Sequence, residues 1–232
     1  MATAVAKRRG RPAAVPGRAA APTRELILDA AERLFAARGV DGVAVRDLAA
    51  EMGITASSLY NHFPSKQALY DAVIERGLGP IVEIVTAAWQ GDLAPTHVQA
   101  TVEALTAHLA RHPHLAPLMQ RALLEESGSV QALIEHRIAT LYRGGMAVIR
   151  KAARNAGWGP EEVPHLGVAL FGMIFAHFTN AAGLQRIPGW SNAPLSEQTL
   201  AVQRRFLQRA ILRLLGPRPQ KPRAKRGNPP HG

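Results

Sequence analysis

The chain has 232 residues, 47% of them hydrophobic, and a formal net charge of +11, which fits one or two globular domains. It contains no cysteine, so a disulfide framework and a cysteine-bound metal site are excluded. No apolar run reaches the roughly 18 residues of a membrane span, and no apolar segment near the amino terminus marks a secretion signal, so we expect a cytoplasmic protein without a membrane partner.

Ten of the eleven excess charges lie in two terminal segments, residues 1–22 and 216–232, and neither segment contains an acid. Both segments are rich in Pro, Gly and Ala and offer no apolar face, so we expect two basic, disordered arms. In the first arm, Arg9 and Arg11 flank a glycine and precede a proline, which resembles the core of an AT-hook. Such arginines suit the narrow minor groove of A·T-rich DNA. A solubilising tail is the alternative.

The first predicted helix covers residues 24–38. Thr23 can cap it, Glu25 favours the positive end of the helix dipole, and Gly39 closes it. Two adjacent rows of apolar residues at a spacing of four form its expected core stripe: Leu26, Ala30 and Leu34, with Ile27, Ala31 and Phe35.

Two short helices joined by a tight turn are predicted next, over residues 46–52 and 56–62. Gly53 suits a left-handed helix end, and Thr55 can cap the second helix. Leu59 and Phe63 point inward from that second helix. Its outward residues are small or neutral: Ala56, Ser57, Ser58, Tyr60, Asn61 and His62. This is a helix-turn-helix arrangement with a face bare enough for a DNA major groove; an ordinary helical hairpin is the alternative.

The strings TRELILDAAERLFAARGVDGVAVRDLA and SLYNHFPSKQALYDAV resemble the TetR family of bacterial transcriptional regulators. The resemblance covers residues 23–74. It implies an all-α fold of about nine helices, with a DNA-binding domain at 23–70 and an effector-binding, dimerising domain at 71–215.

Contacts to double-stranded DNA are predicted within the helix-turn-helix region. Base reading is assigned to Ser57, Ser58 and Asn61, with Thr55 and Ala56 beside them, and phosphate anchoring to Tyr60, His62 and Lys66. The resemblance implies that Arg46 reaches a base or phosphate. Ala44 stands where the family often has a hydroxyl that caps the helix and contacts phosphate. Packing within the head is the alternative for Tyr60 and His62.

The remaining chain reads as helices interrupted by Pro and Gly. A long kinked helix is expected from residue 67 to 89, and further helices are expected at 95–111, 114–126, 130–156, 161–184 and 196–215. By resemblance, the last two pair with their copies to form a homodimer. A symmetric dimer also suits a palindromic operator with two half-sites.

His108 and His112 lie four residues apart, a spacing that can hold a metal. No third ligand or nearby acid is identifiable, so solvated histidines at a helix end are preferred. No catalytic fingerprint is present, so we expect neither an enzyme nor a cofactor.

The resemblance implies an effector pocket in the body. Bulky or flexible residues are its candidate lining: Trp89, Leu105, Met119, Tyr142, Met146, Phe171, Phe175 and Phe178. Each is alternatively plain core or dimer interface. Such a lining suits an apolar ligand.

These features together predict a homodimeric DNA-binding repressor that a small apolar effector releases from its operator. A constitutive DNA-architecture protein that uses its basic tails is the first alternative. A small-molecule enzyme with a DNA-binding head is the second, and it would require turnover.

Overall fold

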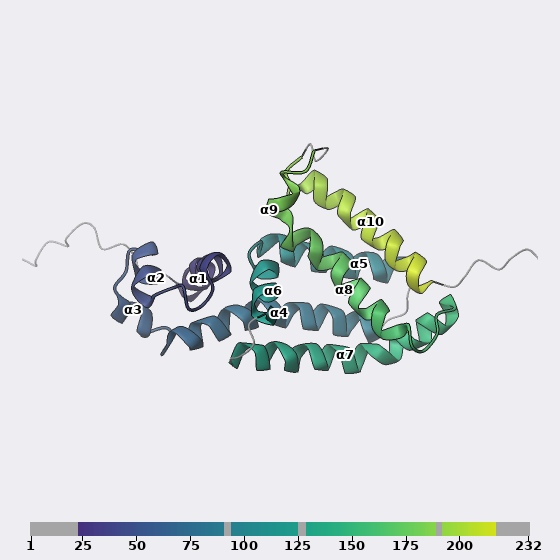
Figure 1. Ribbon diagram of the computed structural model, residues 1–232, viewed down its shortest axis with the longest axis horizontal. Helices are drawn as coiled ribbons and strands as arrows, with labels where there is room; N and C mark the ends of the chain where they lie inside the picture. Colours follow the sequence, from purple (N-terminus) through teal and green to yellow (C-terminus); the bar gives the residue numbers. More distant parts are fainter. Residues whose placement is uncertain (1–22, 91–93, 125–128, 189–191, 217–232) are drawn as a thin grey trace, which may run out of the picture.

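The computed structural model describes residues 23–90, 94–124, 129–188 and 192–216, and these ranges contain helices and no strand (Figure 1). The predicted all-α fold is confirmed, with ten helices in the described ranges against the nine or so expected. In chain order they are α1 Arg24–Arg38, α2 Val45–Glu51, α3 Ala56–Tyr60, α4 Lys66–Gln90, α5 Pro95–Arg111, α6 Leu115–Leu124, α7 Ser129–Ala156, α8 Val163–Thr179, α9 Ala181–Leu184 and α10 Glu197–Leu215.

Helix α1 begins and ends where its local signals predict. The Thr23 side chain accepts a hydrogen bond from the Leu26 amide at 3.4 Å, and Gly39 ends the helix with a φ of 72°. One member of the predicted core stripe is misplaced, because Leu26 is 56% exposed. Ile27 and Leu28 take the inward positions of that first turn, with 0% and 1% exposed, so Leu26 faces outward.

The turn between α2 and α3 has the predicted chemistry. Gly53 adopts a φ of 65°, and the Thr55 hydroxyl accepts a hydrogen bond from the Ser58 amide at 3.1 Å. Helix α3 ends at Tyr60, two residues earlier than predicted, because the His62 amide bonds to the Leu59 carbonyl in a tighter turn at 3.0 Å. Leu59 is buried and fixes this short helix to the core.

Helix α4 is a single long helix, as expected, with Pro80 inside it. It starts beneath α3 and continues through the body, where α5 and α7 lie along it (Figure 1). One connected apolar core includes residues of α1, α4, α5, α6 and α8, so the head and body share their packing.

The predicted helix at 161–184 is divided into α8 and α9 at Asn180. The backbone of Asn180 leaves the helical region with φ −99° and ψ 7°, and its side-chain amide donates to the Ala176 carbonyl at 2.8 Å. A side chain that bonds to the carbonyl four residues earlier in this way competes with the backbone hydrogen bonds that would continue the helix. Within the described ranges, no helix has the length and apolarity needed to cross a lipid bilayer.

Candidate nucleic-acid interface

The outer face of α3 is not covered by any other described part of the chain. Ser57, Tyr60, Asn61 and His62 are exposed, whereas Ala56 and Ser58 are half-buried. The five residues of α3 span about 7.5 Å, less than the roughly 12 Å width of a DNA major groove. The face therefore meets the steric requirement for groove entry.

Tyr60 is 49% exposed, and His62 beside it is also exposed. The alternative that both side chains only pack inside the head is therefore wrong. An exposed phenol and imidazole on the rim of a short helix can donate hydrogen bonds to phosphate oxygens.

Two predicted anchoring cations differ in their surroundings. Arg46 is exposed in the first turn of α2. Lys66 is half-buried, and its ammonium group donates to the Val40 carbonyl at 2.8 Å, which ties the start of α4 to the loop after α1. Ala44 makes no side-chain cap for α2, and the Asp47 carboxylate instead accepts from the Ala44 amide at 3.3 Å.

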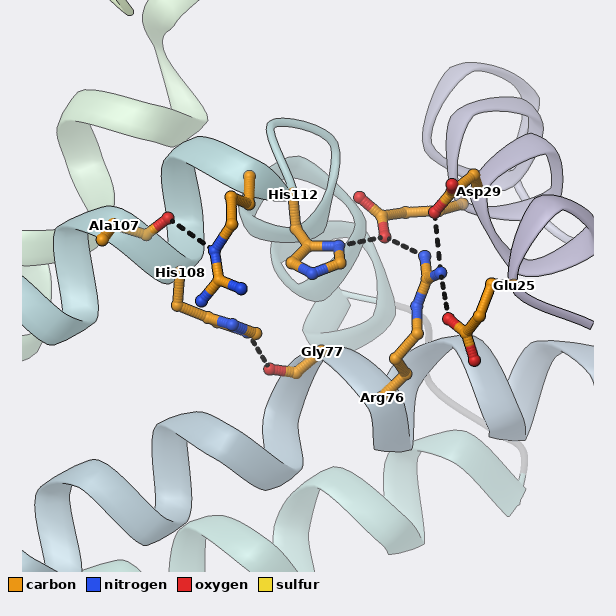
Figure 2. Close-up of polar contacts among 9 residues, drawn as sticks. Glu25, Asp29, Arg76, Gly77, Ala107, His108 and His112 are labelled. Atoms are coloured by element: carbon orange, nitrogen blue, oxygen red, sulfur yellow. Dashed lines mark hydrogen bonds and ion pairs between the residues drawn. The ribbon is translucent and has the colours of Figure 1, made fainter. Parts of the chain in front are cut away.

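A cluster of charged residues joins the head to the body (Figure 2). Arg76 of α4 places Nη1 2.7 Å from Asp29 Oδ1 and 3.4 Å from Glu25 Oε2, and Nη2 2.7 Å from Glu32 Oε2. All three acids belong to α1. Burial lowers the pKa of Arg76, but the hydrogen bonds to Asp29 and Glu32 raise it by more, so its pKa lies above the ordinary value. Arg76 is therefore a permanent cation.

Glu32 is the buried centre of this cluster, with 3% exposure. Its carboxylate also accepts a hydrogen bond from His112 Nδ1 at 3.2 Å, and His112 caps the end of α5. A single carboxylate thus connects α1 with α4 and α5. Sequence reasoning missed this contact, although Glu32 follows the buried Leu28 by four residues and lies in an apolar row.

The histidine pair does not have the predicted solvated setting. His108 is 3% exposed, and its Nε2 donates to the Gly77 carbonyl of α4 at 2.8 Å. Burial lowers the pKa of His108, and this effect exceeds the opposing effect of the hydrogen bond to Gly77. An acid, Glu32, does lie beside His112, contrary to expectation. In the described ranges no group of three or more His, Cys, Asp or Glu residues could hold a metal ion.

The body contains a cavity of about 400 Å³ bordered by α4, α5, α6, α7, α8 and α10, and it is open to solvent where the lining residues Val168 and Phe171 are exposed. Six of the eight candidate residues line it: Trp89, Leu105, Met119, Met146, Phe171 and Phe175. Phe178 does not line the cavity. It is 1% exposed and belongs to the apolar core, which was the alternative to a lining role. Of the lining residues on α4, only Trp89 was predicted from the sequence. Leu78, Ile81 and Val85 also line the cavity and were missed.

Some predictions concern residues outside the described part. Arg9 and Arg11 belong to residues 1–22, and the side chain of Tyr142 on α7 is also outside the described set.

Helices α8 and α10 carry large apolar side chains that are exposed in the single chain. They are Val168 at 72%, Phe171 at 42%, Val202 at 54% and Phe206 at 53%.

Comparison with known proteins adds independent information. Residues 27–73 match the family model described as "Bacterial regulatory proteins, tetR family". The chain is 38% identical over 89 residues to the HTH-type transcriptional repressor BepR of Brucella suis, covering 37% of this chain and 43% of that repressor. It is 27% identical to the HTH-type transcriptional repressor AcnR of Corynebacterium diphtheriae, covering 61% and 70% of the two chains.

Two solved structures extend the likeness to the whole fold. AmtR of Mycobacterium smegmatis gives a TM-score of 0.62 at 24% identity, covering 87% of this chain and 88% of that one. KstR2 of Mycobacterium tuberculosis, described as a ketosteroid transcriptional regulator, gives 0.60 at 21%, covering 83% and 98%. The sequence match to BepR spans less than half of that protein, so these likenesses establish the amino-terminal relationship and the fold.

Proposed function

Since the chain belongs to the TetR family of bacterial regulatory proteins, we propose that it is a homodimeric DNA-binding transcriptional repressor released from its operator by an apolar effector. The observation that carries this proposal is the exposed outer face of α3, held by a buried Leu59 and a capped amino terminus. The proposed DNA-binding domain is residues 23–70, and the proposed effector and dimerisation domain is residues 71–215.

In this proposal α3 enters the major groove. Ser57, Ser58 and Asn61 read base edges because their short polar side chains can both donate and accept hydrogen bonds. Phosphates are bound at the rim of the face, where contacts fix register without specifying sequence. The proposed phosphate-binding residues are Arg46, Tyr60, His62 and Lys66.

Dimerisation is proposed through α8 and α10. Their exposed apolar side chains, Val168, Phe171, Val202 and Phe206, are numerous for a surface in contact with water. A two-fold axis through this face would present two copies of α3 to half-sites about 34 Å apart.

Release from DNA would depend on α4, the helix that the DNA-binding head and the effector-binding body share. Helix α4 begins next to α3, and its later turns line the cavity. An effector that fits better when α4 is displaced would favour a head spacing that mismatches successive grooves. To shift the ratio of the released to the DNA-binding conformation from 1:99 to 99:1, the effector must bind the released conformation more tightly by about 5.5 kcal/mol.

The test is fluorescence anisotropy with labelled duplexes from the gene's own upstream region. We expect saturable, sequence-selective binding that weakens in Asn61→Ala and is unchanged in Glu83→Gln, an exposed body residue on α4. If the basic tails alone bind DNA, affinity would instead fall steeply with salt, would ignore sequence and would be the same in Asn61→Ala. That result would contradict the proposal and favour a DNA-architecture protein.

A further inference from the structure

Among the described residues, the lining of the body cavity comes from six helices and contains no Asp, Glu, Lys or Arg. His97 is the one titratable side chain of this described lining. Glu103 of α5 and Arg204 and Arg205 of α10 border a separate pocket. The described lining therefore provides no permanently charged counter-ion for a charged guest.

Aromatic faces form part of this wall. Phe171 and Phe175 of α8 are stacked, with ring centroids 4.2 Å apart and planes 20° from parallel. Trp89 of α4 packs closely against the backbone of α7, because a Cβ at Gly145 would lie 2.1 Å from ring atom Cζ2. Aromatic side chains that stack favour planar ring systems over compact aliphatic groups.

Hydrogen-bonding side chains at this wall are concentrated near the start of α5. His97 and Thr101 line the cavity there, and Trp89 is the other lining residue with a polar side-chain atom. The Thr101 hydroxyl donates to the His97 carbonyl at 2.8 Å, so its oxygen can accept a further bond. This end can accommodate a neutral hydrogen-bond donor such as a hydroxyl group, which can donate to that oxygen.

We propose that the cavity selects an uncharged, planar ring-containing molecule with a single neutral polar group near Thr101, and rejects the carboxylate and ammonium analogues of the same ring. This inference rests on the proposed effector role and specifies the chemical class of effector. Its physical basis is desolvation: an ion taken from water into an apolar wall without a partner loses its hydration and gains nothing comparable.

Three probes of similar shape test the proposal: 2-naphthylmethanol, 2-naphthoate and 2-naphthylmethylammonium. Each is titrated at pH 7.5, without DNA, against protein loaded with the neutral dye Nile red. We expect the alcohol to displace the dye and the two ions to require concentrations about 100-fold higher or more. Displacement by either ion at the concentration at which the alcohol displaces the dye, or displacement by none of the three probes, would overturn the proposal.

A variant with an added cation tests whether the lack of a counter-ion is the reason that carboxylates bind weakly. Thr101→Lys places a cation at the half-buried mouth of the cavity and should strengthen 2-naphthoate binding by about tenfold or more. Ala100→Lys adds the same charge at an exposed neighbouring position outside the lining and should leave the preference unchanged. Equal effects in the two variants would contradict a charge-free cavity as the cause.

Adding the operator duplex to the same titrations distinguishes a wrong ligand class from a wrong effector role. If 2-naphthylmethanol binds as expected but leaves the operator complex intact, the ligand class stands and the effector role is contradicted. If 2-naphthoate binds and releases DNA, the effector role stands and the ligand class is wrong.

Discussion

Replacing Arg76 by methionine should destabilise the protein far more than replacing an exposed arginine. The Glu32 side chain is 4% exposed, and Arg76 places a guanidinium nitrogen 2.7 Å from it. Removing one partner of a buried ion pair leaves an uncompensated charge, which typically costs about 3–5 kcal/mol. The hydrogen bond from His112 remains, so the lower end of that range is expected.

The other two acids of the cluster add little to this figure. Asp29 and Glu25 are 59% and 67% exposed, so water screens their attraction to Arg76. Exposed pairs contribute about 0–1 kcal/mol. We therefore expect a loss of about 3 kcal/mol for Arg76→Met, which lowers Tm by about 6–12 °C in a chain of this size.

The assay is urea and thermal unfolding followed by circular dichroism at a fixed protein concentration, because the proposed dimerisation would make Tm depend on concentration. Arg33→Met is the matched control, since Arg33 pairs with Glu51 at the surface, where the two are 49% and 44% exposed. A second variant, Arg76→Met with Glu32→Gln, should regain part of the loss because the buried charge is gone. The reasoning is refuted if Arg76→Met and Arg33→Met are equally stable.

Three further predictions concern single side chains. Tyr60→Ala should weaken operator binding by about 10-fold to 100-fold in an anisotropy titration, with unfolding free energy within about 0.5 kcal/mol of wild type; lost folding would instead assign Tyr60 to the core. Burial lowers the pKa of His108 below its ordinary 6.5, so the unfolded chain binds the proton first. Stability should therefore decline as pH falls below 6.5, and this decline should shrink in His108→Gln when urea unfolding at pH 7.5 and 5.5 is compared. Gly77→Ala should cost about 1–3 kcal/mol, because its Cβ would lie 2.1 Å from Leu115 Cδ1, whereas Gly79→Ala on the same helix meets only an ordinary contact; equal losses by urea unfolding would contradict the close approach.

Local signals in the sequence were sufficient for most helix boundaries. Thr23 and Gly39 fix α1, and Gly53 with Thr55 fixes the turn before α3, because caps and left-handed glycines depend on only a few neighbouring residues. Both ends of α5 were also predicted correctly, in this case from prolines: Pro95 begins the helix and Pro113 follows its end.

What the sequence did not predict depends on tertiary partners. Glu32 was not recognised as buried because its partner Arg76 lies 44 residues later on another helix. His108 likewise needs Gly77 of α4 to become a buried hydrogen-bonded residue. Six lining residues of the cavity were among the predicted candidates because bulky apolar residues are limited in number. Most of the lining, including nearly all of the share contributed by α4, required the three-dimensional arrangement.

The central claim, that two copies of the exposed face of α3 read a major groove, is tested most directly by methylation interference on an operator duplex. Methyl groups on guanine N7 project into the major groove, whereas those on adenine N3 project into the minor groove. We predict interference at guanine N7 in two patches about one helical turn apart. Interference confined to adenine N3, or absent from the protein-bound duplex, would contradict it.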